Sequence, residues 1–138
     1  MRLWHYKLLP YLPKSQLVAQ WRELNSIFKK QDNHILINYV YEYPKDDLWR
    51  YTYLLLREFE KRGINVRNYN NMENYFTEGK NWYPLCGCFN PFPNHHNNRY
   101  LLQCFYNLQE KYDRGQKDFS KEQYEELEKF IKEEEKLI

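Results

Sequence analysis

The chain has 138 residues and a mass of 17.4 kDa, which is the length of one domain. Hydrophobic residues make up 42% and charged residues 29%, a composition that excludes wholesale disorder. Its apolar runs, such as Leu54–Leu56, fall far short of the roughly 20 residues that span a membrane. Charged side chains also interrupt Met1–Lys7, so no secretory signal is expected. The sequence predicts one soluble cytoplasmic domain over residues 1–138 that keeps its first residue and binds no membrane.

Glycine is scarce, with four residues, and this disfavours folds built from many strands and tight turns. The chain contains neither of the glycine-rich motifs that hold nucleotide phosphates. No cofactor is therefore expected. The odd count of three cysteines, without a signal peptide, predicts reduced thiols in a cytosol-like compartment.

Charge is unevenly distributed although the net charge is only +2. Residues 1–30 carry six basic side chains and one acid, whereas residues 119–138 carry four lysines and seven glutamates. A basic end of this kind suits a polyanionic partner at one face. The alternative is two solvated helix faces of opposite sign.

The first half of the chain predicts two helices. Residues 1–13, with two prolines, read as irregular, and helical periodicity begins at Ser15, a candidate N-cap, and ends at Phe28. Residues 31–44 fit either a short strand or a buried connector. A second helix starts near Pro44–Asp47 and stops at Gly63.

The second half predicts two more helices after a long irregular stretch over residues 68–93. One helix covers roughly His96–Asp113, and Gly115 ends it. The other begins at Ser120, which forms a capping-box pattern with Gln123. The predicted fold class is all-α: a single compact domain of three to four helices with a long irregular loop.

Glu23 is the candidate acid of the first predicted helix, because it is the only acidic residue in the first 31 positions. It shares a stripe at helical spacing with Gln16, Gln20 and Ile27. A carboxylate flanked by cations is expected to keep a low pKa and to stabilise a developing positive charge. The alternative is an ordinary surface glutamate paired with Arg22 or Lys30.

Several short runs at fixed spacing carry a resemblance to a known family. They are Met1–His5, Leu12, Gln16-Leu17, Ala19, Arg22-Glu23-Leu24, His34 and Lys61–Asn65. In these positions the chain resembles the pyrimidine-dimer DNA glycosylases, also called the endonuclease V family, of phage and bacteria. The resemblance covers roughly residues 1–112 and depends on the joint spacing of these runs.

The resemblance implies an all-α domain whose N-terminus enters the helix layer. It also implies a DNA glycosylase with AP-lyase activity, acting on pyrimidine dimers or abasic sites. The α-amine of Met1 would attack C1′ of the damaged nucleotide and form a Schiff base, and β-elimination would then nick the strand. Glu23 would be the assisting carboxylate.

The partner implied by the resemblance is double-stranded DNA containing damage, bound by a monomer that would be nucleoid-associated in a bacterium. Arg2 and Arg22 would hold phosphates on either side of the lesion. Lys29 and Lys30 would add attraction to the backbone that is independent of sequence. His34 matches a residue of the family and is a further candidate contact.

The sequence departs from the phage pattern at several points. Arg2 is too large for the usual removal of the initiator methionine, so the reacting amine shifts by one residue. Gln16 and Ser26 replace a histidine and a basic residue, and the chain ends in an acidic segment, Glu133–Lys136. Trp82-Tyr83 would supply base stacking or core packing. These departures favour the alternative of a non-catalytic module that binds nucleic acid on the same scaffold.

A set of cysteines and histidines raises a third reading, an interaction protein stabilised by zinc. The set comprises Cys86, Cys88, His95, His96 and Cys104. Its C-x-C spacing is not that of a common zinc knuckle, so buried thiols and surface imidazoles are expected and no metal is predicted. His5 stays open between a site residue and a capped surface histidine.

Overall fold

The computed structural model describes residues 2–30, 34–77 and 89–136, and this part of the chain is helical without a strand. Five α-helices and two 3-10 helices follow one another in the order η1 Tyr6–Tyr11, α1 Lys14–Lys29, η2 Asn38–Glu42, α2 Lys45–Arg62, α3 Asn70–Thr77, α4 Asn98–Asp113 and α5 Lys121–Lys136. The predicted all-α class is confirmed, with more helices than the three or four expected. No helix of the described residues is long and apolar enough to cross a membrane.

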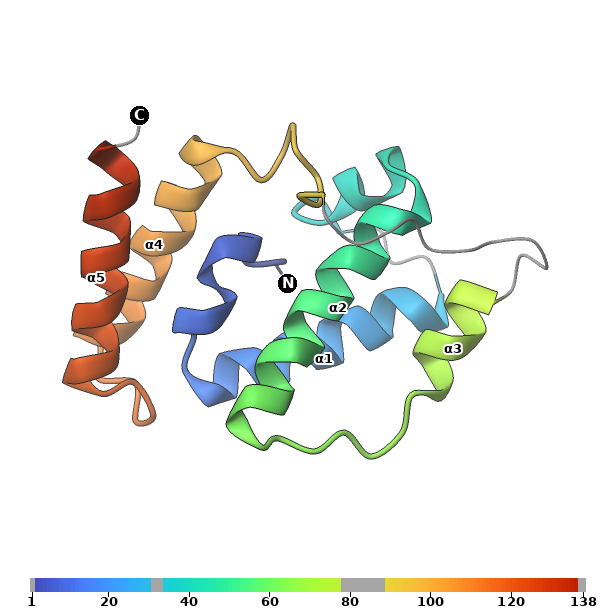
Figure 1. Ribbon diagram of the computed structural model, residues 1–138, viewed down its shortest axis with the longest axis horizontal. Helices are drawn as coiled ribbons and strands as arrows, with labels where there is room; N and C mark the ends of the chain where they lie inside the picture. The colour runs from blue at the N-terminus through green and yellow to red at the C-terminus, as the bar shows by residue number, and fades with distance from the viewer. Residues whose placement is uncertain (1, 31–33, 78–88, 137–138) are drawn as a thin grey trace.

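The short helix η1 lies between two pairs of longer helices, α1 with α2 and α4 with α5 (Figure 1). Its neighbours in sequence are buried with it, so the start of the chain forms the centre of the core rather than an appendage. Leu3, Trp4, Leu8, Leu9 and Leu12 are all less than a tenth exposed. The expected packing of the N-terminal segment into the helix layer is confirmed for these residues.

The first thirteen residues are more regular than their two prolines suggest. Pro10 lies inside η1, and Pro13 is the N-cap of α1, where its fixed φ suits the residue that precedes a helix. The predicted cap at Ser15 is wrong. The Ser15 N–H and hydroxyl both donate to Asp118, at 2.7 and 3.0 Å, and so tie the start of α1 to the loop before α5.

The second helix begins and ends where its capping signals place it. Pro44 precedes the first turn of α2, and Gly63 ends the helix in the left-handed conformation with φ of 68°. Of the two interpretations left open for residues 31–44, the described part, from residue 34, is a connector and not a strand, and only two of its residues are buried. It contains η2, and Ile37 and Val40 lie in the core.

The irregular stretch predicted over residues 68–93 is wrong in its first third, because residues 70–77 form α3. The Asn68 side chain accepts the N–H of Asn70 at 3.3 Å, a local turn that starts the helix. Phe76 then packs edge-to-face on Phe28 of α1. Residues 78–88, which include the Trp82-Tyr83 pair considered for base stacking, lie outside the described residues.

The last two helices keep their predicted positions; the start of α4 is corrected, and at α5 the Gln123 half of the predicted capping box is wrong. α4 begins at Asn98, two residues later than expected, because the Asn97 side chain caps it by accepting the N–H of Tyr100 at 2.9 Å. Ser120 accepts the N–H of Gln123 at 3.1 Å as predicted. The Gln123 side chain donates to the Leu12 carbonyl at 3.0 Å and so links α5 to the segment between η1 and α1.

The left-handed cap of α2 generates a stability prediction. Gly63→Ala should lower the free energy of unfolding by about 1 kcal/mol, because a Cβ strains this backbone conformation although the space around it is empty. Gly63→Asn should lose less, since asparagine tolerates the left-handed region. Urea unfolding followed by circular dichroism measures both, and equal stability of Gly63→Ala and the unmodified protein would contradict the assignment.

Candidate active site

A buried glutamine on α1 holds the start of the chain. Gln20 is 1% exposed. Its Oε1 accepts the N–H of Trp4 at 2.8 Å, and its Nε2 donates to the Arg2 carbonyl at 3.1 Å. One side-chain amide therefore satisfies two backbone groups of an extended segment that has no strand partner.

Two tyrosines on other helices form further hydrogen bonds to the same N-terminal segment. The Tyr51 hydroxyl, on α2, lies 2.7 Å from the Trp4 carbonyl and 3.0 Å from Gln20 Oε1. The Tyr100 hydroxyl, on α4, donates to the Leu3 carbonyl at 2.5 Å. Residues 2–4 are thus fixed by side chains from α1, α2 and α4.

Two neutral histidines extend the network to residues 5–7. His5 Nδ1 accepts the N–H of Lys7 at 3.1 Å, so its Nε2 carries the proton and donates to the His96 carbonyl at 2.9 Å. His96 Nδ1 accepts the N–H of Tyr6 at 3.3 Å, and its Nε2 lies 2.7 Å from the Tyr39 hydroxyl.

Burial decides the charge state of both imidazoles. It lowers the pKa of His5 to about 4, and burial together with the neighbouring imidazoles lowers the pKa of His96 to about 2. Both rings are therefore neutral at pH 7. The prediction of surface imidazoles is wrong for His96, and the surface alternative for His5 is wrong as well, because both rings are buried.

Glu23 lies one turn beyond Gln20 on the same face of α1. It accepts from Gln20 Nε2 at 2.8 Å and from the backbone N–H of Arg2, and it is half-buried. Loss of solvent raises the pKa of the carboxyl, and the bonds from Arg2 and Gln20 with the charge of Arg22 offset this only in part. The predicted low pKa is wrong, because desolvation outweighs the cations.

The other predicted site residues separate into two groups around α1. The Arg2 guanidinium lies over the Tyr100 ring of α4, 5.8 Å from its centroid. Arg22 and Lys29 lie on another face of the helix and line a groove of about 720 Å³. Arg67, which the sequence analysis did not single out, lines the same groove and adds a third cation.

The remaining two predicted contacts lie at the end of α1 and beyond it. Lys30 is the exposed C-cap residue of α1, one residue past the groove-lining Lys29. His34 is half-buried, and its Nδ1 accepts the N–H of Leu36 at 3.2 Å. Met1, the predicted nucleophile, lies outside the described residues.

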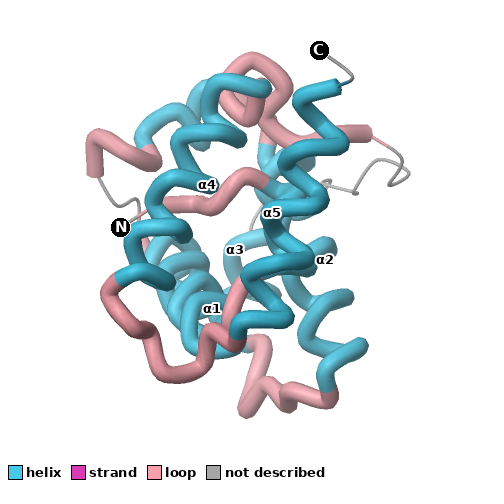
Figure 2. The backbone as a smooth tube through the Cα atoms, turned by 90° about the vertical axis from the view of Figure 1, so that its left-hand side faces the viewer, coloured by secondary structure: helices cyan, strands magenta, loops and turns pink. Residues whose placement is uncertain are grey.

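The acidic helix α5 packs mainly on η1 and α4, whereas Glu23 lies on α1. The segment of residues 2–5 enters the core on the side of α1 and α4, whereas α2 and α5 lie on the other side (Figure 2). Lys7 and Glu134 form an ion pair at 3.0 Å that joins η1 to α5. This ion pair offsets one of the negative charges of α5.

The cysteine and histidine set is only partly visible. Cys104 is buried near Tyr100 on α4, whereas Cys86 and Cys88 lie outside the described residues. Among the residues that are described, no three His, Cys, Asp or Glu side chains are grouped so as to hold a metal ion. His95 instead bonds Tyr43 at 2.7 Å and Glu42 at 3.4 Å.

Comparison with protein families gives one match, to the pyrimidine dimer DNA glycosylase family, over residues 1–72. The chain belongs to this family of DNA-repair glycosylases. The match spans the chain start, the whole of α1 with Glu23, and the whole of α2. No curated protein and no solved structure matches the chain.

Several residues that hold the N-terminal segment were not identified as site residues from the sequence. The sequence places Gln20 on the same helical stripe as Glu23. The sequence does not indicate, however, whether a glutamine at this position is buried or exposed. Tyr51, Tyr100 and His96 carry no local signal, because the partners of these side chains lie at least 31 residues away in the chain.

The buried histidines generate a pH prediction. Their pKa values are lower in the folded protein than the unfolded value of 6.5, so the unfolded state binds more protons below that pH. The free energy of unfolding should be unaffected above pH 7 and should fall by about 4 kcal/mol between pH 7 and pH 5.

Urea unfolding at fixed pH values measures this slope. His5→Gln should remove about half of the slope between pH 6.5 and pH 5. An unmodified protein whose stability is constant from pH 7 to pH 5 would contradict neutral buried rings.

Proposed function

We propose that this chain is a monomeric DNA glycosylase with AP-lyase activity that acts on pyrimidine dimers or abasic sites in double-stranded DNA. The α-amine of Met1 is the proposed nucleophile, and Glu23 is the proposed assisting carboxylate. Membership of the pyrimidine dimer DNA glycosylase family supports the substrate class.

The observation that carries the proposal is the hydrogen bond from the Arg2 backbone N–H to Glu23. The Arg2 nitrogen is separated from the Met1 amine by only the two backbone carbons of Met1. Standard bond lengths keep these two nitrogens within about 4 Å of each other. The proposed acid therefore contacts the residue covalently bonded to Met1, and this supports pairing it with the proposed nucleophile.

The α-amine is the better nucleophile at neutral pH for a simple reason. Its ordinary pKa of about 7.7–8.0 leaves about a tenth of the amine unprotonated, whereas a lysine with a pKa of about 10.4 is almost wholly charged. Only the neutral amine has the lone pair that attacks carbon. No buried lysine is needed for this chemistry.

The proposed reaction balances without a cofactor. The amine lone pair forms a bond to C1′ while the bond from C1′ to the base breaks, and the base leaves with that electron pair and takes up a proton. Loss of the amine proton and opening of the sugar ring give the iminium. Removal of a C2′ proton then expels the 3′ phosphate by β-elimination, and water releases the enzyme.

Glu23 fits the proton transfers of this sequence. Its pKa is raised by desolvation, so it exchanges protons closer to neutral pH than an exposed glutamate does. When ionised, it stabilises the positive charge of the iminium. Its bond from Gln20 fixes the carboxylate relative to the chain start.

The cationic groove fits the DNA backbone. Arg22, Lys29 and Arg67 supply charge that is independent of sequence, and Lys30 continues the charge past the end of α1. Arg2 and His34 are proposed as further polar contacts to DNA near the reacting sugar. Binding should weaken steeply as salt is raised.

Borohydride trapping tests the chemistry, because it reduces the iminium to a stable adduct between protein and DNA. Glu23→Gln should reduce cleavage of an abasic duplex by about 100-fold or more and leave duplex affinity within about threefold. Glu122→Gln, the same change on exposed α5, should cleave normally. Salt-dependent binding without any adduct in the unmodified protein would establish the non-catalytic binding module instead.

The nucleophile is tested separately by selective acetylation of the α-amine. The acetylated protein should form no borohydride adduct, because an amide nitrogen has no reactive lone pair, and should keep its thermal unfolding midpoint. Gel analysis of the adduct measures the first and circular dichroism the second. An undiminished adduct would assign the chemistry to another amine.

A further inference from the structure

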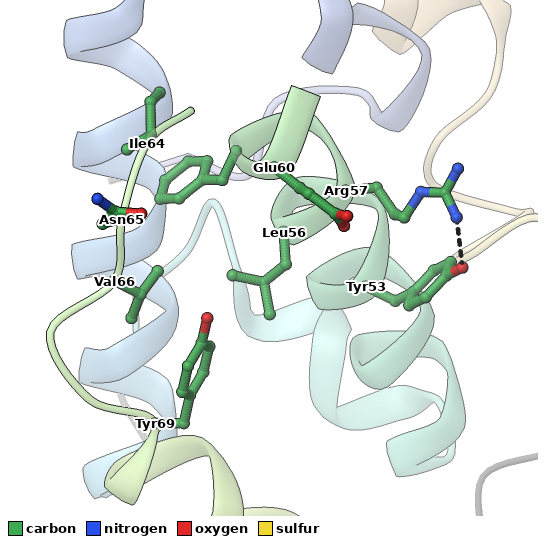
Figure 3. A pocket seen from close by; sticks show the side chains of 9 residues that line it. Tyr53, Leu56, Arg57, Glu60, Ile64, Asn65, Val66 and Tyr69 are labelled. Atoms are coloured by element: carbon green, nitrogen blue, oxygen red, sulfur yellow. Dashed lines mark hydrogen bonds between the residues drawn. The ribbon is translucent and has the colours of Figure 1, made fainter. Parts of the chain in front are cut away.

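The exposed face of α2 carries a ridge of two side chains, Tyr53 and Arg57, with a groove on either side. Arg57 donates to the Tyr53 hydroxyl at 3.1 Å, and both side chains stand at the edge of the pocket in Figure 3. Tyr53 is two residues from Tyr51, whose hydroxyl bonds the chain start. Helical geometry therefore turns the ridge away from Glu23.

One groove, of about 400 Å³ between η1 and α2, is cationic. Arg50, Arg57 and Lys61 line it. The acidic residue that lines this groove, Glu58, forms an ion pair with Arg62, with 2.8 Å between Glu58 Oε1 and Arg62 Nε. Three positive side chains without a free acid suit an anionic ligand with more than one charge.

The other groove, of about 530 Å³, combines aromatic and aliphatic side chains with the polar Arg57, Glu60 and Asn65. Leu56 and Val66 form its floor, and Tyr69 points into it (Figure 3). Tyr53 and Tyr69 are 37% and 41% exposed, although both are large rings. Glu60 is the acid of this groove.

The ridge is held in place before any ligand binds. The Trp49 ring stacks on Tyr53 with centroids 5.5 Å apart and planes at 10°. The Arg50 guanidinium lies 5.5 Å from the centre of the Tyr53 ring, and its Nε donates to the Phe89 carbonyl at 3.1 Å. Binding there costs little side-chain ordering.

We propose that this face of α2 is a second nucleic-acid site, for single-stranded DNA, apart from the duplex site at Glu23. A ligand that spans the ridge needs several anionic groups on one side and flat apolar groups on the other. Single-stranded DNA has both: phosphates for Arg50, Arg57 and Lys61, and unpaired bases for Tyr53 and Tyr69. An acidic peptide supplies the charge without the rings.

Fluorescence anisotropy with a labelled 12-nucleotide oligothymidine tests the proposal. Tyr53→Leu should weaken binding about tenfold, the loss of one stacked base. Arg57→Gln with Lys61→Gln should reduce the slope of log affinity against log salt by about 1.4, since each contact contributes about 0.7.

The matched control is Lys129→Gln with Lys132→Gln on exposed faces of α5, which should bind the oligonucleotide as the unmodified protein does. Arg22→Gln should weaken duplex binding and spare the oligonucleotide. Borohydride trapping on an abasic duplex should be unchanged in the α2 variants. Failure of the single-stranded DNA site can therefore be distinguished from failure of the proposed lyase activity. Unaltered oligothymidine affinity in both α2 variants would overturn the site, as would equal binding of a polyglutamate peptide.

Discussion

The side-chain amide of Gln20 is the interaction on which the rest of the site depends. Its oxygen and nitrogen hold Trp4 and Arg2, and the same nitrogen bonds Glu23. The start of the chain and the candidate acid are thereby fixed to one turn of α1. An extended segment in a helical protein lacks a strand to pair with, so a buried side chain must satisfy its backbone groups.

The polar network around this amide is fully partnered, and that is why it can be buried. Within the described residues, no buried side-chain nitrogen or oxygen lacks a hydrogen-bond partner. Tyr51, Tyr100 and His96 each donate to or accept from the segment, and desolvation raises the pKa of both tyrosines. Such a network is rigid while the tyrosines and histidines are neutral. Adding a second proton to the histidine rings removes their acceptor nitrogens and breaks it.

Acidic and basic side chains gather at different places on this fold. Glu23 lies beside the chain start, the cations of α1 line a groove on another face of that helix, and the acids of α5 belong to a helix that packs on η1 and α4. The modest net charge of +2 hides this separation. A basic face suits a duplex, whereas the ridge on α2 offers rings as well as charge and therefore suits unpaired bases.

The sequence by itself determined the helical class, the span of α2, the start of α5 and the face of α1 that carries Glu23, because these follow from local periodicity and capping. It also carried the family resemblance. Only the tertiary structure decided that η1 fills the core, that Gln20 and His96 are buried, and that the pKa of Glu23 is raised. These properties depend on solvent exclusion by residues distant in the chain, which no local pattern encodes.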